Sequence, residues 1–271
     1  MPMSRIGLLS PRSKRTRSIF LALVASLLLA SQASAQPVLN DPVVSADELY
    51  FAGEPIQAYE LLKTHLAVDS TDYEALWRAA RAAVVVGVVR EGITAQNEFL
   101  DPAIVLGDRA VAVRPDGIDG LYWRGAAEGR RALNAGNDYA SRLVQRVFDD
   151  AHAILALDSL HAGAHNLLGR VNYEIMVLSR VERMLARMLM NNRALQESSW
   201  DSAALHLRRA AELEPDNVLY WLDLAQLYVR RGREDDARTV LNRVIEMHSV
   251  HPPDDVFKDT ARRWLGELDS E

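Results

Sequence analysis

Apolar residues between Val44 and Leu268 recur mostly at three- and four-residue steps, the spacing that places them on one face of a helix. Four of these stretches end alike, with a short apolar run, a polar residue and then serine or proline. Proline cannot continue the helix, and serine can cap the next one. The end residues are Ser70, Pro115, Ser159 and Pro215, which lie 45, 44 and 56 residues apart. The pattern predicts an all-α chain of repeated helix pairs.

A small residue lies ten positions after each of these ends, namely Ala80, Gly125, Gly169 and Ala225. Trp77, Trp123 and Trp221 stand two to four residues before three of them. In tetratricopeptide (TPR) units a small residue is needed where paired helices approach closely, and we expect the tryptophans to fill the groove between helices. The spacing therefore predicts a TPR-like array.

The last repeat matches the TPR pattern best, with Trp221, Leu224, Ala225, Tyr228, Gly232 and Ala237 in order. Gly232 suits the left-handed residue that ends a helix. The other repeats exceed the usual period of about 34 residues. We therefore predict a TPR-like helical-hairpin solenoid with irregular repeat lengths, in which Pro253–Leu268 forms a C-terminal capping helix.

Local patterns predict several helix boundaries. Ser45-x-x-Glu48 and Thr71-x-x-Glu74 match the capping box, and Pro102 suits a first helical position. The run 82–89 is rich in β-branched residues, which favour strands. It follows the helical stretch 76–81 without a turn, so it is interpreted as the buried end of a long helix.

Residues 1–35 have the layout of a secretory signal peptide. A basic segment without acidic residues precedes an apolar stretch from Ile19 to Ala30, and Ala33-Ser34-Ala35 has the small-x-small pattern of a cleavage site. We expect cleavage after Ala35 and export, to the bacterial periplasm; an uncleaved anchor is the alternative. A short linker, 36–43, then precedes the repeat domain, 44–271.

The net charge and the lack of cysteine limit the classes of partner and of covalent modification that are expected. The formal net charge is −6, and segment 1–35, with five basic residues, would leave a still more acidic chain. Nucleic-acid binding is not expected, because phosphate contacts need clustered cations. The chain has no cysteine, which excludes disulfides and lipid attachment to a cysteine.

The segment 173–195 carries an apolar stripe together with arginine and methionine. It is interpreted as one helix, either packed in the core or exposed as a docking face for a partner or membrane surface. Methionine adapts to varied ligands and arginine pairs with acidic groups. The candidate partner-contact residues are Arg180, Arg183, Met184, Arg187 and Met188.

No motif for nucleotide binding, a nucleophile elbow or a zinc protease occurs, so no catalytic residue, metal site or cofactor is expected. His161 and His165 share a helical spacing that can bind zinc, with His152 nearby. They are interpreted as a helix start and a surface pair, because no carboxylate completes the pattern.

Several segments resemble the regulator of microtubule dynamics family. The opening motif is the most specific part, and the similarity covers nearly all of 44–268. The segments that carry it are 46–50, 53–54, 59–62, 74–82, 168–170, 183–187, 199–200, Ala203, Leu207, 209–210 and Pro215. Animal members are TPR-like proteins linked to microtubules and organelle contacts, with no catalytic reaction known for the family. The resemblance implies the fold and protein binding; microtubule binding is not carried over to an exported chain.

Taken together, these patterns predict a non-catalytic periplasmic scaffold or adaptor that binds other proteins or peptides. Two alternatives stay open. The wide spacing of the middle repeats could enclose a small ligand, and segment 173–195 could tether the protein to a membrane surface.

Overall fold

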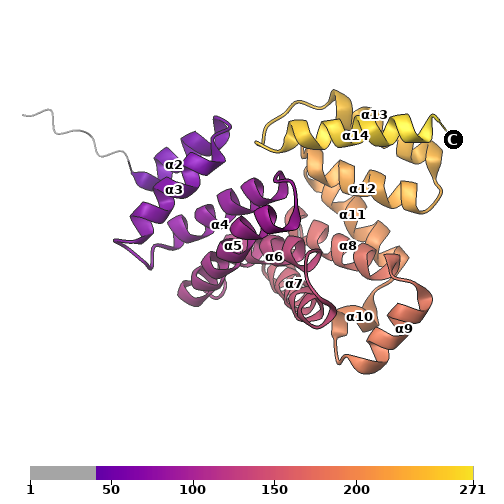
Figure 1. Ribbon diagram of the computed structural model, residues 1–271, viewed down its shortest axis with the longest axis horizontal. Helices are drawn as coiled ribbons and strands as arrows, with labels where there is room; N and C mark the ends of the chain where they lie inside the picture. The colour runs from indigo at the N-terminus through magenta and orange to yellow at the C-terminus, as the bar shows by residue number, and fades with distance from the viewer. Residues whose placement is uncertain (1–40, 271) are drawn as a thin grey trace, which may run out of the picture. The chain divides into compact units, whose positions relative to one another are not determined.

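The computed structural model describes residues 41–270, and every structural statement below refers to this range. It folds into 13 α-helices and contains no strand there (Figure 1). The helices are α2 (Pro42–Phe51), α3 (Pro55–Leu66), α4 (Tyr73–Val88), α5 (Ile93–Val113), α6 (Ile118–Ala132), α7 (Asn137–Leu157), α8 (Ala162–Val177), α9 (Arg180–Leu189), α10 (Arg193–Glu197), α11 (Trp200–Leu213), α12 (Val218–Arg230), α13 (Glu234–Glu246) and α14 (Asp254–Leu268).

The helices form consecutive antiparallel pairs. These are α2/α3, α4/α5, α6/α7, α8/α11 and α12/α13, and α14 covers the last pair. The first helix of each pair also packs against the first helix of the next, from α2 through to α14. The all-α TPR-like prediction is therefore confirmed. In chain order the short helices α9 and α10 are inserted between α8 and α11, and Figure 1 shows them to one side of these two helices. This insertion explains the longest repeat spacing.

The four predicted helix ends agree with the structure. Helices α3, α5, α7 and α11 end at Leu66, Val113, Leu157 and Leu213. Gly232 follows α12 with a φ of 68°, a conformation in which only glycine is unstrained. The β-branched run also continues α4 as a helix to Val88, where it is almost entirely buried.

Three predicted helix starts were wrong. Ser45 lies inside α2, whose N-cap is Asp41, and Asp72 rather than Thr71 caps α4 by accepting bonds from Glu74 and Ala75. Pro102 lies within α5 rather than at its start. In each case nearby residues determine where the helix begins more strongly than the short sequence pattern does. Aspartate caps at least as well as serine or threonine, and the buried residues on both sides of Pro102 hold α5 together.

The small positions lie at close approaches between helices. A Cβ on Gly169 would be 2.6 Å from the Leu207 side chain, on the partner helix α11. A Cβ on Gly125 would be 3.0 Å from Leu167 on α8. Ala80 and Ala225 are fully buried. Since interiors are close-packed, larger side chains at these positions would push the helices apart.

Residues 1–40 and 271 lie outside the described range. The predicted signal peptide and the start of the linker fall there. Within 41–270, no helix combines the length and apolar character that crossing a bilayer requires.

Candidate binding cavity

The first helices of the pairs line a cavity of about 830 Å³. Side chains of α2, α4, α6, α8, α12 and α14 contribute to it, joined by parts of α7 and α9. Much of the wall is apolar, with Val85 from α4, Val144 from α7 and Val171 and Ile175 from α8. This size and character suit an apolar ligand or a peptide side-chain cluster.

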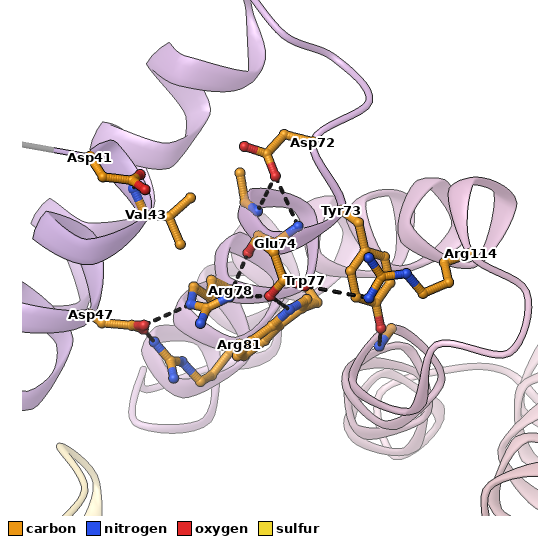
Figure 2. A network of polar contacts seen from close by, with 12 residues as sticks. Asp41, Val43, Asp47, Asp72, Tyr73, Glu74, Trp77, Arg78, Arg81 and Arg114 are labelled. Carbon is orange, nitrogen blue, oxygen red and sulfur yellow. Dashed lines mark hydrogen bonds and ion pairs between the residues drawn. The ribbon is translucent and has the colours of Figure 1, made fainter. Parts of the chain in front are cut away.

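Ion pairs between α2 and α4 fix the N-terminal end of the cavity. Figure 2 shows Arg78 and Arg81 of α4 both directed at Asp47 of α2. The Arg78 Nε–Asp47 distance is 2.7 Å, and the Arg81 guanidinium lies 3.9 Å above the Tyr50 ring. Trp77 donates its indole N–H to Glu74, 2.9 Å away. These contacts hold Trp77 and Arg81 in the cavity wall.

A buried polar cluster joins α8 to α12. Asn166 donates to Asp223 at 2.8 Å, and Arg170 approaches the other carboxylate oxygen of Asp223 at 3.3 Å. Arg170 also donates to Glu174 and Gln226. The guanidinium of Arg170 is therefore well supplied with acceptors from the protein itself, as a buried charge requires.

Two tyrosines meet in the same region. The hydroxyl oxygens of Tyr122 on α6 and Tyr220 on α12 lie 3.4 Å apart. Burial raises the pKa of Tyr122 to about 12, so both rings stay neutral and can donate or accept a hydrogen bond at neutral pH.

Arg130 of α6 also lines the cavity, yet within residues 41–270 its guanidinium has no hydrogen bond or ion pair. Burial lowers the pKa of Arg130, with Arg170 adding to the effect, whereas Asp223 and Glu174 oppose it from a distance. An arginine stays protonated at neutral pH even so. By accessible surface Arg130 is half-buried, so the cavity wall presents one unpaired positive charge that solvent still reaches.

The prediction of one helix over 173–195 was wrong, because the segment is divided into three. Helix α8 ends at Val177, and Ser179 then caps α9 in a capping box with Glu182. Asn192 caps α10. Two strong N-caps within fourteen residues interrupt the apolar periodicity.

No residue of α9 is buried. Its apolar residues are exposed at one helical spacing, with exposed fractions of 62% for Val181, 59% for Met184, 42% for Leu185, 69% for Met188 and 76% for Leu189. Leu185 and Leu189 also line the cavity. We call these five side chains the α9 stripe.

The predicted contact arginines have partners within the chain. Arg183 donates to the carbonyl oxygens of Met176 and Leu178, at 3.1 and 2.8 Å. Arg187 donates to those of Leu195 and Ser198, at 2.7 and 3.1 Å. These bonds close the loops on both sides of α9. Arg180 is exposed, and the two methionines belong to the α9 stripe.

The predicted repeat positions are not all in helix–helix grooves. Trp77 and Trp123 line the cavity. Trp221 is half-buried; it donates to the carbonyl oxygen of Pro215 at 2.9 Å and lies under the Arg243 guanidinium. Ala237 and Tyr228 are buried. The tryptophans thus face the cavity or a helix end, where their N–H groups reach acceptors or solvent.

The histidines serve local roles. His161 caps α8 by accepting from Ala164, and His165 lies 2.9 Å from His206, ring nitrogen to ring nitrogen. Among the described residues, no group of three potential ligands is placed to hold a metal ion.

Sequence reasoning missed the cavity residues Tyr122, Arg130 and Arg170. The sequence carries a signal for Tyr122 and Arg130, because Tyr122, Trp123, Ala126 and Arg130 recur at helical spacing and share one face of α6. That face was not recognised, since an arginine on a tryptophan-bearing stripe is usually a solvent-exposed residue.

Comparisons with known proteins give structural matches and one family match. A crystal structure of a TPR protein from the thermophile Thermus thermophilus matches with a TM-score of 0.59 and 19% identity, over 85% of this chain and 98% of that one. MamA from Desulfovibrio magneticus matches with a TM-score of 0.43 and 16% identity, over 86% and 98%. No curated protein sequence gives a significant match. The family model described as regulator of microtubule dynamics protein 1-3 matches residues 43–269. The chain belongs to the regulator of microtubule dynamics family.

Proposed function

We propose that the chain is a non-catalytic, exported adaptor that binds a protein or peptide partner in the cavity of its first helices. The observation that carries this proposal is the cavity itself. It runs along one helix of every pair, and its wall combines apolar side chains with a few fixed polar ones. Helical-repeat proteins use such surfaces to hold extended peptides or helices.

Two carboxylates that lie behind the lining side chains are tied into ion pairs and hydrogen bonds. Asp47 pairs with two arginines, and Asp223 pairs with Arg170 and Asn166. Carboxylates held in this way are poor general bases, because their lone pairs are already occupied. They hold Arg81 and Arg170 in place in the cavity wall.

The periplasmic location is proposed from the signal-peptide layout of segment 1–35. Cell fractionation followed by N-terminal sequencing tests it. We expect a periplasmic protein that starts at Gln36; a cytoplasmic protein with an intact N-terminus would contradict the proposal.

Site-directed photocrosslinking in living cells tests where the partner binds. A photoreactive residue at Leu133, in the cavity wall, should crosslink to a defined protein. The same residue at Val105 of α5 is the matched control, since the exposed fractions are 52% and 57% and Val105 is not part of the lining. Equal crosslinking from both positions, or none from Leu133, would argue against the proposal.

Carriage of a small apolar ligand is the second candidate, and the apolar wall between α4, α7 and α8 favours it. Native mass spectrometry of freshly purified protein distinguishes the two candidates. A constant added mass below about 1 kDa would support carriage.

The α9 stripe supports a further contact, with a partner or a membrane surface. Exposed apolar patches of this kind mark interaction sites, and arginines flank this one. Sedimentation with anionic vesicles, compared between the unmodified chain and Met188→Glu, measures the membrane contribution.

A further inference from the structure

Arg130 differs from the other cavity arginines in having no partner within residues 41–270. Arg81 pairs with Asp47, and Arg170 has Glu174, Asp223 and Gln226 as acceptors. The two carboxylates that act on Arg130 from a distance, Asp223 and Glu174, are thus already bonded to Arg170. Five N–H donors of Arg130 remain available to a bound group.

An anion bound here would interact more strongly than on the open surface. Contact with a carboxylate provides two parallel N–H···O bonds, and the partly desolvated setting strengthens them. The same bonds would give the half-buried guanidinium of Arg130 the acceptors that it lacks within residues 41–270. The position therefore favours a planar anion such as a carboxylate.

Apolar residues neighbour Arg130 in the cavity lining. Ala126 lies one turn before it on α6, Leu133 is the C-cap residue after α6, and Val171 of α8 belongs to the same lining. The lining also holds carboxylates, among them Glu174, so the apolar part of a group bound at Arg130 fits best against Ala126, Leu133 and Val171. Asn137 and Ser141 of α7 add amide and hydroxyl groups to this wall, which suit peptide backbone rather than a bare hydrocarbon chain.

We propose that the cavity receives the C-terminal segment of a partner protein, with apolar side chains against α6 and α8 and the free carboxylate on Arg130. This inference rests on the proposed adaptor function and specifies the chemistry of its partner. A chain terminus supplies a carboxylate right next to apolar side chains, and no internal acidic side chain is needed. Arg130 is then the residue that selects for the chain end.

Peptide pairs provide the test. A library of ten-residue peptides with varied apolar C-termini is synthesised twice, once with free carboxylates and once as C-terminal amides, and binding to the full chain is measured by fluorescence polarisation. We expect the tightest carboxylate peptides to bind at least about tenfold better than their amides, as losing a charge-assisted hydrogen bond predicts. This comparison uses the unmodified protein and does not depend on any variant.

Two variants then locate the effect. Arg130→Gln should abolish the difference between carboxylate and amide, because carboxylate binding falls to the level of amide binding. Arg208→Gln is the matched control, since Arg208 is exposed on α11, away from the cavity lining. It should preserve the full difference. Circular dichroism melts confirm that both variants fold.

The outcomes separate this inference from the adaptor function. Equal binding of carboxylate and amide peptides, or a preference that survives in Arg130→Gln, would overturn the role of Arg130 and leave the adaptor proposal standing. Failure of every peptide, with dodecanoic acid bound in their place, would overturn both and favour small-ligand carriage.

Discussion

Helices α4 and α9 both carry apolar residues at helical spacing, yet they differ sharply in burial. Thirteen of the 16 residues of α4 are buried, including Val84, Val85 and Val86. None of the ten residues of α9 is buried. Helix α4 packs against α2, α3, α5 and α6, whereas α9 packs mainly against the short α10.

The difference shows that an apolar stripe is core only where the chain supplies a covering helix. In α4 the stripe stabilises the repeat array. In α9 a cap at Ser179 and a break before Asn192 separate the stripe from the repeat helices, so its side chains stay exposed beside the cavity. Burial in α4 therefore serves the fold, and exposure in α9 leaves apolar surface for binding.

Truncation in α4 should have the largest effect. Leu76 is fully buried, so Leu76→Ala should lower the free energy of unfolding by about 2–5 kcal/mol, through lost burial and the cavity left behind. Urea denaturation measures it. A loss below about 1 kcal/mol would mean that α4 is not part of a close-packed core.

The second-largest loss of stability is expected where α8 lies close to α11. In Gly169→Ala the new Cβ would lie 2.6 Å from Leu207 and 2.9 Å from its backbone nitrogen, so we expect a loss of about 1–3 kcal/mol. Gly266→Ala in α14 is the control, because nothing lies within 4 Å of its Cβ position. It should be neutral or stabilising by up to about 1 kcal/mol. Equal effects at both sites would contradict the packing described here.

A buried glutamate, Glu128 of α6, and a glutamate of the exposed helix α9, Glu182, should affect the free energy of unfolding differently as the pH changes. Glu128 in α6 is fully buried, and desolvation raises its pKa to about 8, although Arg146 lies 2.8 Å from one oxygen. The folded state therefore holds a proton that the unfolded state releases near pH 4.5, so Glu128 costs stability progressively as the pH rises from about 4.5 to 8. Glu128→Gln should be more stable than the unmodified chain by about 1–3 kcal/mol at pH 8, and equal near pH 4.5.

Glu182 of α9 is the control for this measurement. Hydrogen bonds from Ser179 lower the pKa of Glu182, so its contribution to stability is constant above pH 5 and is lost only in more acidic solution. Thermal melts of Glu182→Gln between pH 5 and 8 should run parallel to those of the unmodified chain. If the difference in melting temperature between Glu182→Gln and the unmodified chain grew as the pH rose, the contrast between Glu128 and Glu182 would be wrong.

The smallest effect on stability is expected in the α9 stripe. Leu185→Glu should change the free energy of unfolding by less than about 0.5 kcal/mol, because the side chain is exposed. It should weaken peptide binding, since Leu185 lines the cavity. Unfolding of this variant would show that α9 belongs to the core.

The sequence predicted the repeat architecture well, because helix ends and small residues are local signals. Ser70, Pro115, Ser159 and Pro215 each follow a helix that ends where expected, and Gly169 lies at a close helix contact. It did not predict the cavity. Arg130 and Arg170 look alike in sequence, and only the tertiary arrangement of residues 41–270 gives acceptors to one and leaves the other free. The local signal for the division of 173–195 is the capping box Ser179-x-x-Glu182, and the apolar periodicity that continues across it hides this signal.

Hydrogen–deuterium exchange of the purified chain, with and without a bound apolar peptide carrying a free carboxylate, tests the central claim most directly. Before binding, amides of α4 should exchange slowly and those of α9 rapidly, as burial predicts. Binding should add protection in α6, α8 and α9, which line the cavity, and leave α5 and α11 unchanged. Protection confined to α5 and α11, or slow exchange of α9 in the free protein, would contradict the account.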